Sequence, residues 1–133
     1  MKKKYTLKKE GDLYRLFALR SFPYVSKGDK GGLVSGPDNL SQEGNCWIYE
    51  NAQAIEDAMV VDDAVVLGKA RVSGYALVKG KARVSGHARI KDGAVIAGRA
   101  RVKGEIEVKD KALITGDVSL TGQKSIGDCQ IIE

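Results

Sequence analysis

The sequence predicts an all-β, single-domain protein whose chain winds into a parallel β-helix. Three observations lead to this fold class. From Gly44 to Gly127 the chain repeats every six residues, fourteen times, without an insertion or deletion. The first position of every hexad is Gly, Asp or Glu, and the fifth is always apolar. Six-residue repeats of this kind are typical of parallel β-helices.

Each position of the hexad has a physical role. Gly, and to a lesser degree Asp, tolerates the left-handed backbone of a tight corner, so the first position predicts a turn. The third position is Ala in ten of fourteen hexads and the fifth is nearly always Val or Ile. Residues two apart share one face of a strand, so these two positions predict an inward Ala–Val pair. A helix is disfavoured, because a Gly every six residues would cost about 0.8–1.0 kcal/mol each time.

Residues 1–43 differ in composition from residues 44–133, and we expect them to form a cap. Residues 5–7 and 13–19 alternate in the manner of two strands, with Gly11 in the turn between them, which predicts a β-hairpin. Residues 26–39 are a Gly- and Asp-rich loop, in which Val34 approaches the hexad phase, as does Leu40 just after it. An open β-helix end would expose strand edges and core, which a cap must cover. At the other end, residues 128–133 predict one last strand with Ile132 inward.

The small–x–aliphatic hexad resembles the hexapeptide repeat of left-handed β-helix proteins. The resemblance covers about two thirds of the chain and implies a left-handed coil of 18 residues with three sides. It implies about 4–5 triangular coils over residues 44–133. Such proteins commonly form trimers side by side, so the resemblance also favours a trimer.

A second likeness concerns the segment before the repeat. Gly28-Asp-Lys-Gly-Gly32, followed by Asn39-Leu-Ser41 and Gly44-Asn-Cys-Trp-Ile48, resembles the opening of small hexapeptide-repeat proteins from bacteriophage and prophage genomes. This resemblance implies a phage or prophage origin, and in that setting a small rigid protein that blocks a host factor or defence system.

If one coil takes 18 residues, side chains 18 apart stack on one wall, about 4.8 Å from each other. The outward fourth position of one wall is then apolar in every coil. We call this row the apolar stripe; it consists of Met59, Leu77, Val95, Leu113 and Ile131. Three interpretations stay open: an interface between copies of the chain, a surface covered by the N-terminal segment, or tolerated surface residues.

The other two walls carry basic residues. The set comprises Lys69, Arg71, Lys81, Arg83, Arg89, Arg99 and Arg101. These side chains either keep an exposed β surface soluble or bind an anion: nucleic acid, nucleotide or an acidic protein. Aromatic platforms for single strands are scarce, and Tyr75 is the one candidate near these walls.

Enzymatic chemistry has one candidate residue. Hexapeptide acyltransferases, to which the resemblance extends, usually place a catalytic His between subunits as a general base. The single His of this chain, His87, lies in an outward position between Lys69 and Glu105, where an ordinary surface role is equally consistent. A zinc site needs several such ligands, so we expect no metal, and no motif indicates a cofactor.

Composition sets the remaining limits. The 133 residues carry 22 basic and 17 acidic side chains, a net charge of +5 that suits an acidic partner. Cys46 and Cys129 are predicted to lie about four coils apart, too far for a disulfide, which favours a reducing cytoplasm. No apolar run follows the basic start, so we expect no signal peptide and no membrane partner.

Together these observations predict a non-catalytic, self-associating interaction protein that binds through its basic walls. An acyltransferase using His87 is the alternative.

Overall fold

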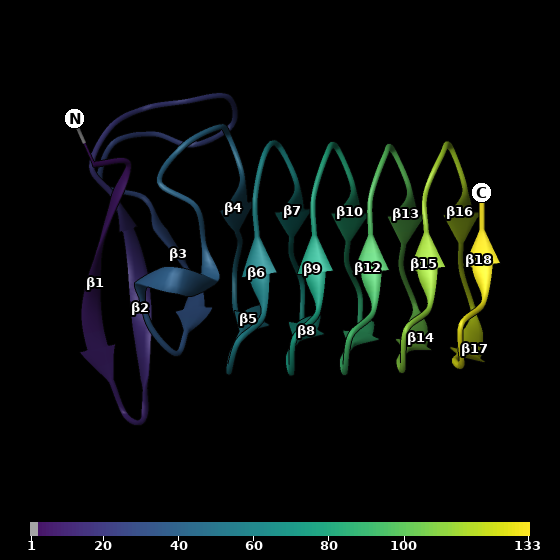
Figure 1. Cartoon of the computed structure of the whole chain (residues 1–133). Coiled ribbons are helices and arrows are strands. Elements are labelled where there is room, and N and C mark those ends of the chain that lie inside the picture. The colour runs from purple at the N-terminus through teal and green to yellow at the C-terminus, as the bar shows by residue number, and fades with distance from the viewer. Residues whose placement is uncertain (1–2) are drawn as a thin grey trace.

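The computed structural model describes residues 3–133 and shows a β-solenoid of stacked parallel coils (Figure 1). The lap of the coil is 18 residues: Leu77 pairs in parallel register with Met59 on one side and Val95 on the other. The predicted sorting of side chains to three walls is therefore confirmed. The left-handed sense stays an implication of the resemblance.

One wall, which we call the stripe sheet, has five parallel strands. Its order is β6 (Met59–Val60), β9 (Leu77–Val78), β12 (Val95–Ile96), β15 (Leu113–Ile114) and β18 (Ile131–Ile132). The last strand is the one predicted at the C-terminal end.

A second wall, the arginine sheet, also has five parallel strands. Its order is β4 (Trp47–Ile48), β7 (Val65–Val66), β10 (Arg83–Val84), β13 (Arg101–Val102) and β16 (Ser119–Leu120).

The third wall, the long sheet, combines the repeat with the N-terminal segment in eight strands. Its order is β1 (Tyr5–Glu10), β2 (Leu13–Ala18), β3 (Lys30–Val34), β5 (Gln53–Ala54), β8 (Arg71–Val72), β11 (Arg89–Ile90), β14 (Glu105–Val108) and β17 (Gln123–Ile126). The first two pairings, β1–β2 and β2–β3, are antiparallel and the rest are parallel.

The core is the column of inward third- and fifth-position side chains. Most of them are completely buried, as in Ala82, Val84 and Ile90. Because the interior is this narrow, Ala at the third position lets the three walls approach while the β-branched fifth position fills the axis.

The corners have the left-handed backbone that the first position predicts. Gly80 has φ of 67°, and a Cβ there would lie 2.9 Å from the carbonyl oxygen of Gly98 in the next lap. Asp62 has φ of 57°, and its carboxylate accepts a hydrogen bond from the backbone N–H of Gly80 at 3.0 Å. Acidic corners thus offset part of the conformational cost by bonding to the lap above.

The predicted N-terminal hairpin is present, with β1 and β2 joined at Gly11 and Asp12. It lies at the N-terminal end of the solenoid, beside β3 (Figure 1). Trp47 of the first lap is only 1% exposed, because the rings of Tyr5 and Phe22 pack edge-on against it.

Parallel pairing begins upstream of Gly44. Leu33 of β3 pairs with Gln53, and Leu40, which follows the 3-10 turn η1 (Pro37–Asn39), forms a bridge with Val60. Both pairs are 20 residues apart rather than 18. The extra residues accommodate the turn at Pro37, so this first partial lap escapes a strict hexad count.

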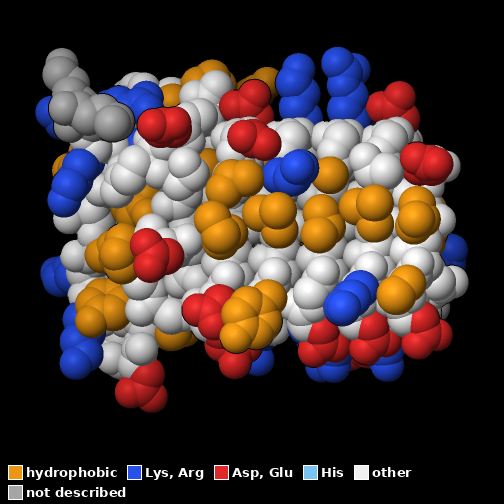
Figure 2. All heavy atoms as spheres, in the orientation of Figure 1, with side chains coloured by type: hydrophobic (Ala, Val, Ile, Leu, Met, Phe, Trp, Pro, Cys, Tyr) orange, Lys and Arg blue, Asp and Glu red, His pale blue; other side chains and the backbone are white. Residues whose placement is uncertain are grey.

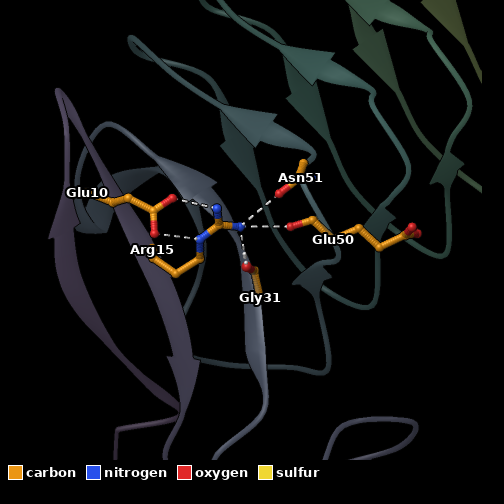
Figure 3. A network of polar contacts seen from close by, with 5 residues as sticks. All are labelled: Glu10, Arg15, Gly31, Glu50 and Asn51. Carbon is orange, nitrogen blue, oxygen red and sulfur yellow. Dashed lines mark hydrogen bonds and ion pairs between the residues drawn. The ribbon is translucent and has the colours of Figure 1, made fainter.

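Three buried polar side chains connect this partial lap to the first full one. Arg15 donates from one guanidinium nitrogen to the carbonyl oxygens of Gly31 and Glu50 and the side-chain oxygen of Asn51, and its other nitrogens contact the Glu10 carboxylate (Figure 3). Asn39 donates to the carbonyl oxygen of Ala58 at 2.8 Å. The third is Lys4.

Lys4 has a completely buried side chain. Its ammonium nitrogen lies 2.7 Å from the carbonyl oxygen of Cys46 and 3.2 Å from the Cys46 sulfur. Burial lowers the pKa of Lys4 and raises the pKa of Cys46, and each group partly opposes the shift of the other.

Within residues 3–133, no helix combines the length and the apolar character that crossing a bilayer requires.

Candidate interaction surfaces

The apolar stripe is a straight row on the outer face of the stripe sheet. Adjacent members are direct partners in the parallel ladder, so their side chains stack along the solenoid. Figure 2 shows them as a continuous band of hydrophobic side chains. Met59 is 45% exposed and Ile131 is 65% exposed, while the three central members shield one another and are half-buried.

The N-terminal segment does not lie on this band. Its strands extend the long sheet, and its aromatic rings pack on Trp47 of the arginine sheet. Near the stripe sheet, it contributes only η1 and Leu40, which continue the sheet beyond β6 rather than covering it. Cover by residues 1–43, one of the three interpretations, is therefore wrong for the described residues.

The predicted basic residues divide between two walls. Arg83 and Arg101 are direct ladder partners on the arginine sheet, with Lys81 and Arg99 just before them in sequence. Arg71 and Arg89 are direct partners on the long sheet, where Lys69 lies two residues before Arg71. Within the described chain, none of these four arginines forms an ion pair.

Uncompensated pairs of like charge are a cost to the sheet. Neighbouring strands lie about 4.8 Å apart, and like charges that face each other across them are destabilising. The two arginine pairs differ in their surroundings, because β11 also pairs with β14, which places Glu107 beside Arg89. The pair Arg83 and Arg101 has no acidic ladder neighbour.

A cleft of about 950 Å³ lies over the arginine sheet. One end is aromatic and apolar, and the other is basic. The residues at the two ends are Tyr24, Tyr49, Val65 and Leu67, and Lys81, Arg83 and Arg101. The two acidic side chains at its edge, Glu50 and Asp63, are already bonded to the backbone N–H groups of Gly68 and Asn45.

Tyr24 stands at the tip of a tight turn in this cleft. Phe22 and Val25 exchange two backbone hydrogen bonds, of 2.9 and 2.8 Å, around Pro23 and Tyr24. Tyr24 has φ of 67°, at the third turn position, which Gly usually occupies. Its ring is 96% exposed. A bulky residue in this conformation costs about 1–3 kcal/mol and often indicates function.

Tyr49 lies half-buried between the turn and the arginines. Burial raises the pKa of its phenol, the positive charge of Arg83 opposes that rise, and Asp29 and Tyr24 add to it. These influences place Tyr49 close to both Arg83 and the 20–29 loop.

The expectation that Tyr75 is the one aromatic near the basic walls is wrong. Tyr75 is 76% exposed in a shallow hollow with the corner residues Asp92 and Asp110, away from the arginines. Tyr24 and Tyr49 were missed because the 20–29 loop is not periodic and its position could not be read from the hexads. The available signal was Pro23-Tyr24 itself, a turn sequence without the expected Gly.

His87 is exposed in a polar groove of about 680 Å³ on the long sheet. Lys69, Arg71 and Arg89 line the same groove. In residues 3–133, the imidazole makes no hydrogen bond to another side chain. Its acidic neighbour Glu105 is instead bonded to the side-chain amide of Gln123.

The corner beside the stripe sheet carries stacked aspartates. Asp92 accepts from the N–H of Asp110 at 3.1 Å, and Asp110 accepts from that of Asp128 at 2.7 Å. These bonds explain the row structurally. Among the described residues, no three His, Cys, Asp or Glu side chains form a group that could hold a metal ion. Cys46 is buried and Cys129 is exposed, and both are free thiols.

Comparison with known proteins adds no assignment. No protein-family model matches the chain, and a search of curated proteins finds no match.

Proposed function

We propose that the protein is a non-catalytic interaction protein that self-associates through the apolar stripe and binds an acidic partner through its basic walls. The observation that carries the proposal is the stripe itself: five aliphatic side chains in ladder register, with no segment of the described chain over them. Exposed apolar patches of this kind are usually interaction sites.

A second copy of the chain is the occupant that fits the stripe. The row is straight and runs the length of the repeat, so another straight row of the same spacing matches it residue by residue. Side chains in ladder register recur about every 4.8 Å on both copies. The resemblance to hexapeptide-repeat proteins favours three copies.

The binding function is inferred from the charge of the other walls. Two arginine pairs without ion-pair partners provide an electrostatic surface for an acidic protein or a nucleic acid. From the likeness of residues 28–48 to small phage and prophage proteins, we infer that the partner is a host or defence component, which the protein would inhibit in the host cytoplasm.

Assembly is tested by light scattering coupled to a sizing column. We expect the unmodified protein to elute as an oligomer, and the double variant Leu77→Glu/Leu113→Glu as a monomer, because two carboxylates would be buried unpaired at the interface. The matched control is Ser119→Glu/Ser125→Glu, which adds the same charge at exposed strand positions of the other walls. A monomeric unmodified protein, or dissociation by the control, would contradict the proposal.

Acyl transfer through His87 is the second candidate, favoured by the groove that His87 shares with three cations. It is tested by the release of coenzyme A from acetyl-coenzyme A. The binding proposal predicts no activity above that of the His87→Ala variant. Turnover that disappears in His87→Ala would establish the enzyme instead.

A further inference from the structure

We propose that the cleft over the arginine sheet is a binding site for a free nucleotide, with the base against Tyr24 and Tyr49 and the phosphates against Arg83 and Arg101. This inference rests on the proposed binding function and names the ligand class of one basic wall.

The shape and size of the cleft support a small ligand. Its volume of about 950 Å³ is within the range of small-molecule sites, which is about 300–1,000 Å³. Its bottom is apolar at Val65 and Leu67, where the first two laps carry aliphatic rather than basic outward residues. The site is therefore amphiphilic along its length, which suits a ligand with a planar apolar part and an anionic part.

The basic end is suited to phosphate. Arg83 and Arg101 project from adjacent strands of one ladder, so their guanidinium groups are held about one strand spacing apart. Guanidinium groups bind phosphate oxygens in a bidentate manner, and two of them with Lys81 match a diphosphate better than a single carboxylate. A phosphate ligand would also remove the repulsion between the two arginines.

The aromatic end supplies the second, independent observation. Tyr24 combines a left-handed backbone with an almost fully exposed ring, and both features are unfavourable in the free protein. The strain and the exposure are accounted for if the ring stacks on a ligand. Stacking on an aromatic ring is available to every base, so the site does not by itself select one base.

The groove on the long sheet provides the comparison. It has the same arginine pair one wall away, Arg71 and Arg89, but no aromatic residue lines it. If charge alone determined binding, the two walls would be equivalent.

The experiment measures the affinity of ADP, pyrophosphate and adenosine by titration calorimetry at fixed ionic strength. We expect ADP to bind more tightly than either fragment, because only ADP occupies both ends. Arg83→Gln/Arg101→Gln should weaken ADP binding by about tenfold or more. The matched control Arg71→Gln/Arg89→Gln, with the same charge loss on the other wall, should leave it unchanged.

Tyr24→Gly separates a ligand role from a structural one. Gly adopts positive φ freely, so this variant should melt at a higher temperature than the unmodified protein and yet bind ADP about fivefold or more weakly. Unchanged ADP affinity in Tyr24→Gly, equal losses in both arginine double variants, or pyrophosphate binding as tightly as ADP would overturn the nucleotide assignment.

A single-stranded oligonucleotide that binds while ADP does not would likewise overturn the assignment, in favour of nucleic acid. Failure here is distinguishable from failure of the self-association proposal, because that assembly is measured with stripe variants and without ligand.

Discussion

Residues 44–133 and residues 3–43 satisfy the backbone of the solenoid in different ways. Within the repeat, the carbonyls of each lap accept hydrogen bonds from the backbone N–H groups of the preceding lap, as when Met59 N–H donates to the carbonyl of Ala76. The first lap has no complete predecessor. There, Lys4, Arg15 and Asn39 donate from their side chains to carbonyls at its three corners.

This difference explains why the three buried polar or charged side chains of the described chain all belong to residues 3–43. Asn39, for example, donates to the carbonyls of Glu56 and Ala58, the positions that in the next lap, at Gly74 and Ala76, receive N–H groups from Asp57 and Met59. The N-terminal segment is therefore more than an apolar cover. It supplies the missing donors, since buried carbonyls must be paired.

The largest effect should come from the apolar column of the repeat. Ile90 is completely buried between Val72 and Val108 in the ladder, so Ile90→Ala should lower the free energy of unfolding by about 2–5 kcal/mol. Ile132→Ala, in the half-buried last strand, should cost about 1 kcal/mol or less. Chemical denaturation measures both, and equal losses would contradict lap-by-lap stability.

The next effect tests the side-chain donors of the cap. Arg15→Leu keeps apolar bulk but leaves three oxygens without their donor, so we expect a loss of about 2–4 kcal/mol. Arg71→Leu, an exposed arginine without an ion pair, should stay within about 0.5 kcal/mol. If Arg15→Leu proved as mild as this control in thermal unfolding, the carbonyls would not depend on the cap.

The smallest effect depends on pH and concerns Tyr5. Burial raises the pKa of the Tyr5 phenol to about 12 from its usual 10, and the phenol donates to the carbonyls of Pro37 and Leu40. Because the unfolded chain ionises first, this stabilisation is complete below about pH 10 and is lost as the pH rises toward 12.

Tyr5→Phe should therefore cost about 1 kcal/mol at neutral pH and make unfolding less sensitive to pH between 10 and 12. Denaturant titrations at a series of alkaline pH values measure this slope. Parallel slopes for the two proteins would show that another group dominates.

The sequence predicted the repeat better than its surroundings, for physical reasons. An 18-residue lap without insertions determines every wall, so the stripe, the arginine pairs and the inward columns follow from residue numbers alone. The 20-residue first lap, the Arg15 contacts and the position of Tyr24 depend on tertiary packing that has no period. The two basic walls look alike in sequence, and only the 20–29 loop makes them different.

The constant register also determines which changes in length the protein can accept. Removing or duplicating 18 residues would shorten or lengthen the rod by one lap of about 4.8 Å and leave every remaining side chain on its original wall. A change of six residues would keep the core phase intact, yet it would rotate everything downstream by one third of a turn. Leu113 would then leave the row that begins at Met59, so the surfaces would be scrambled while the fold survived.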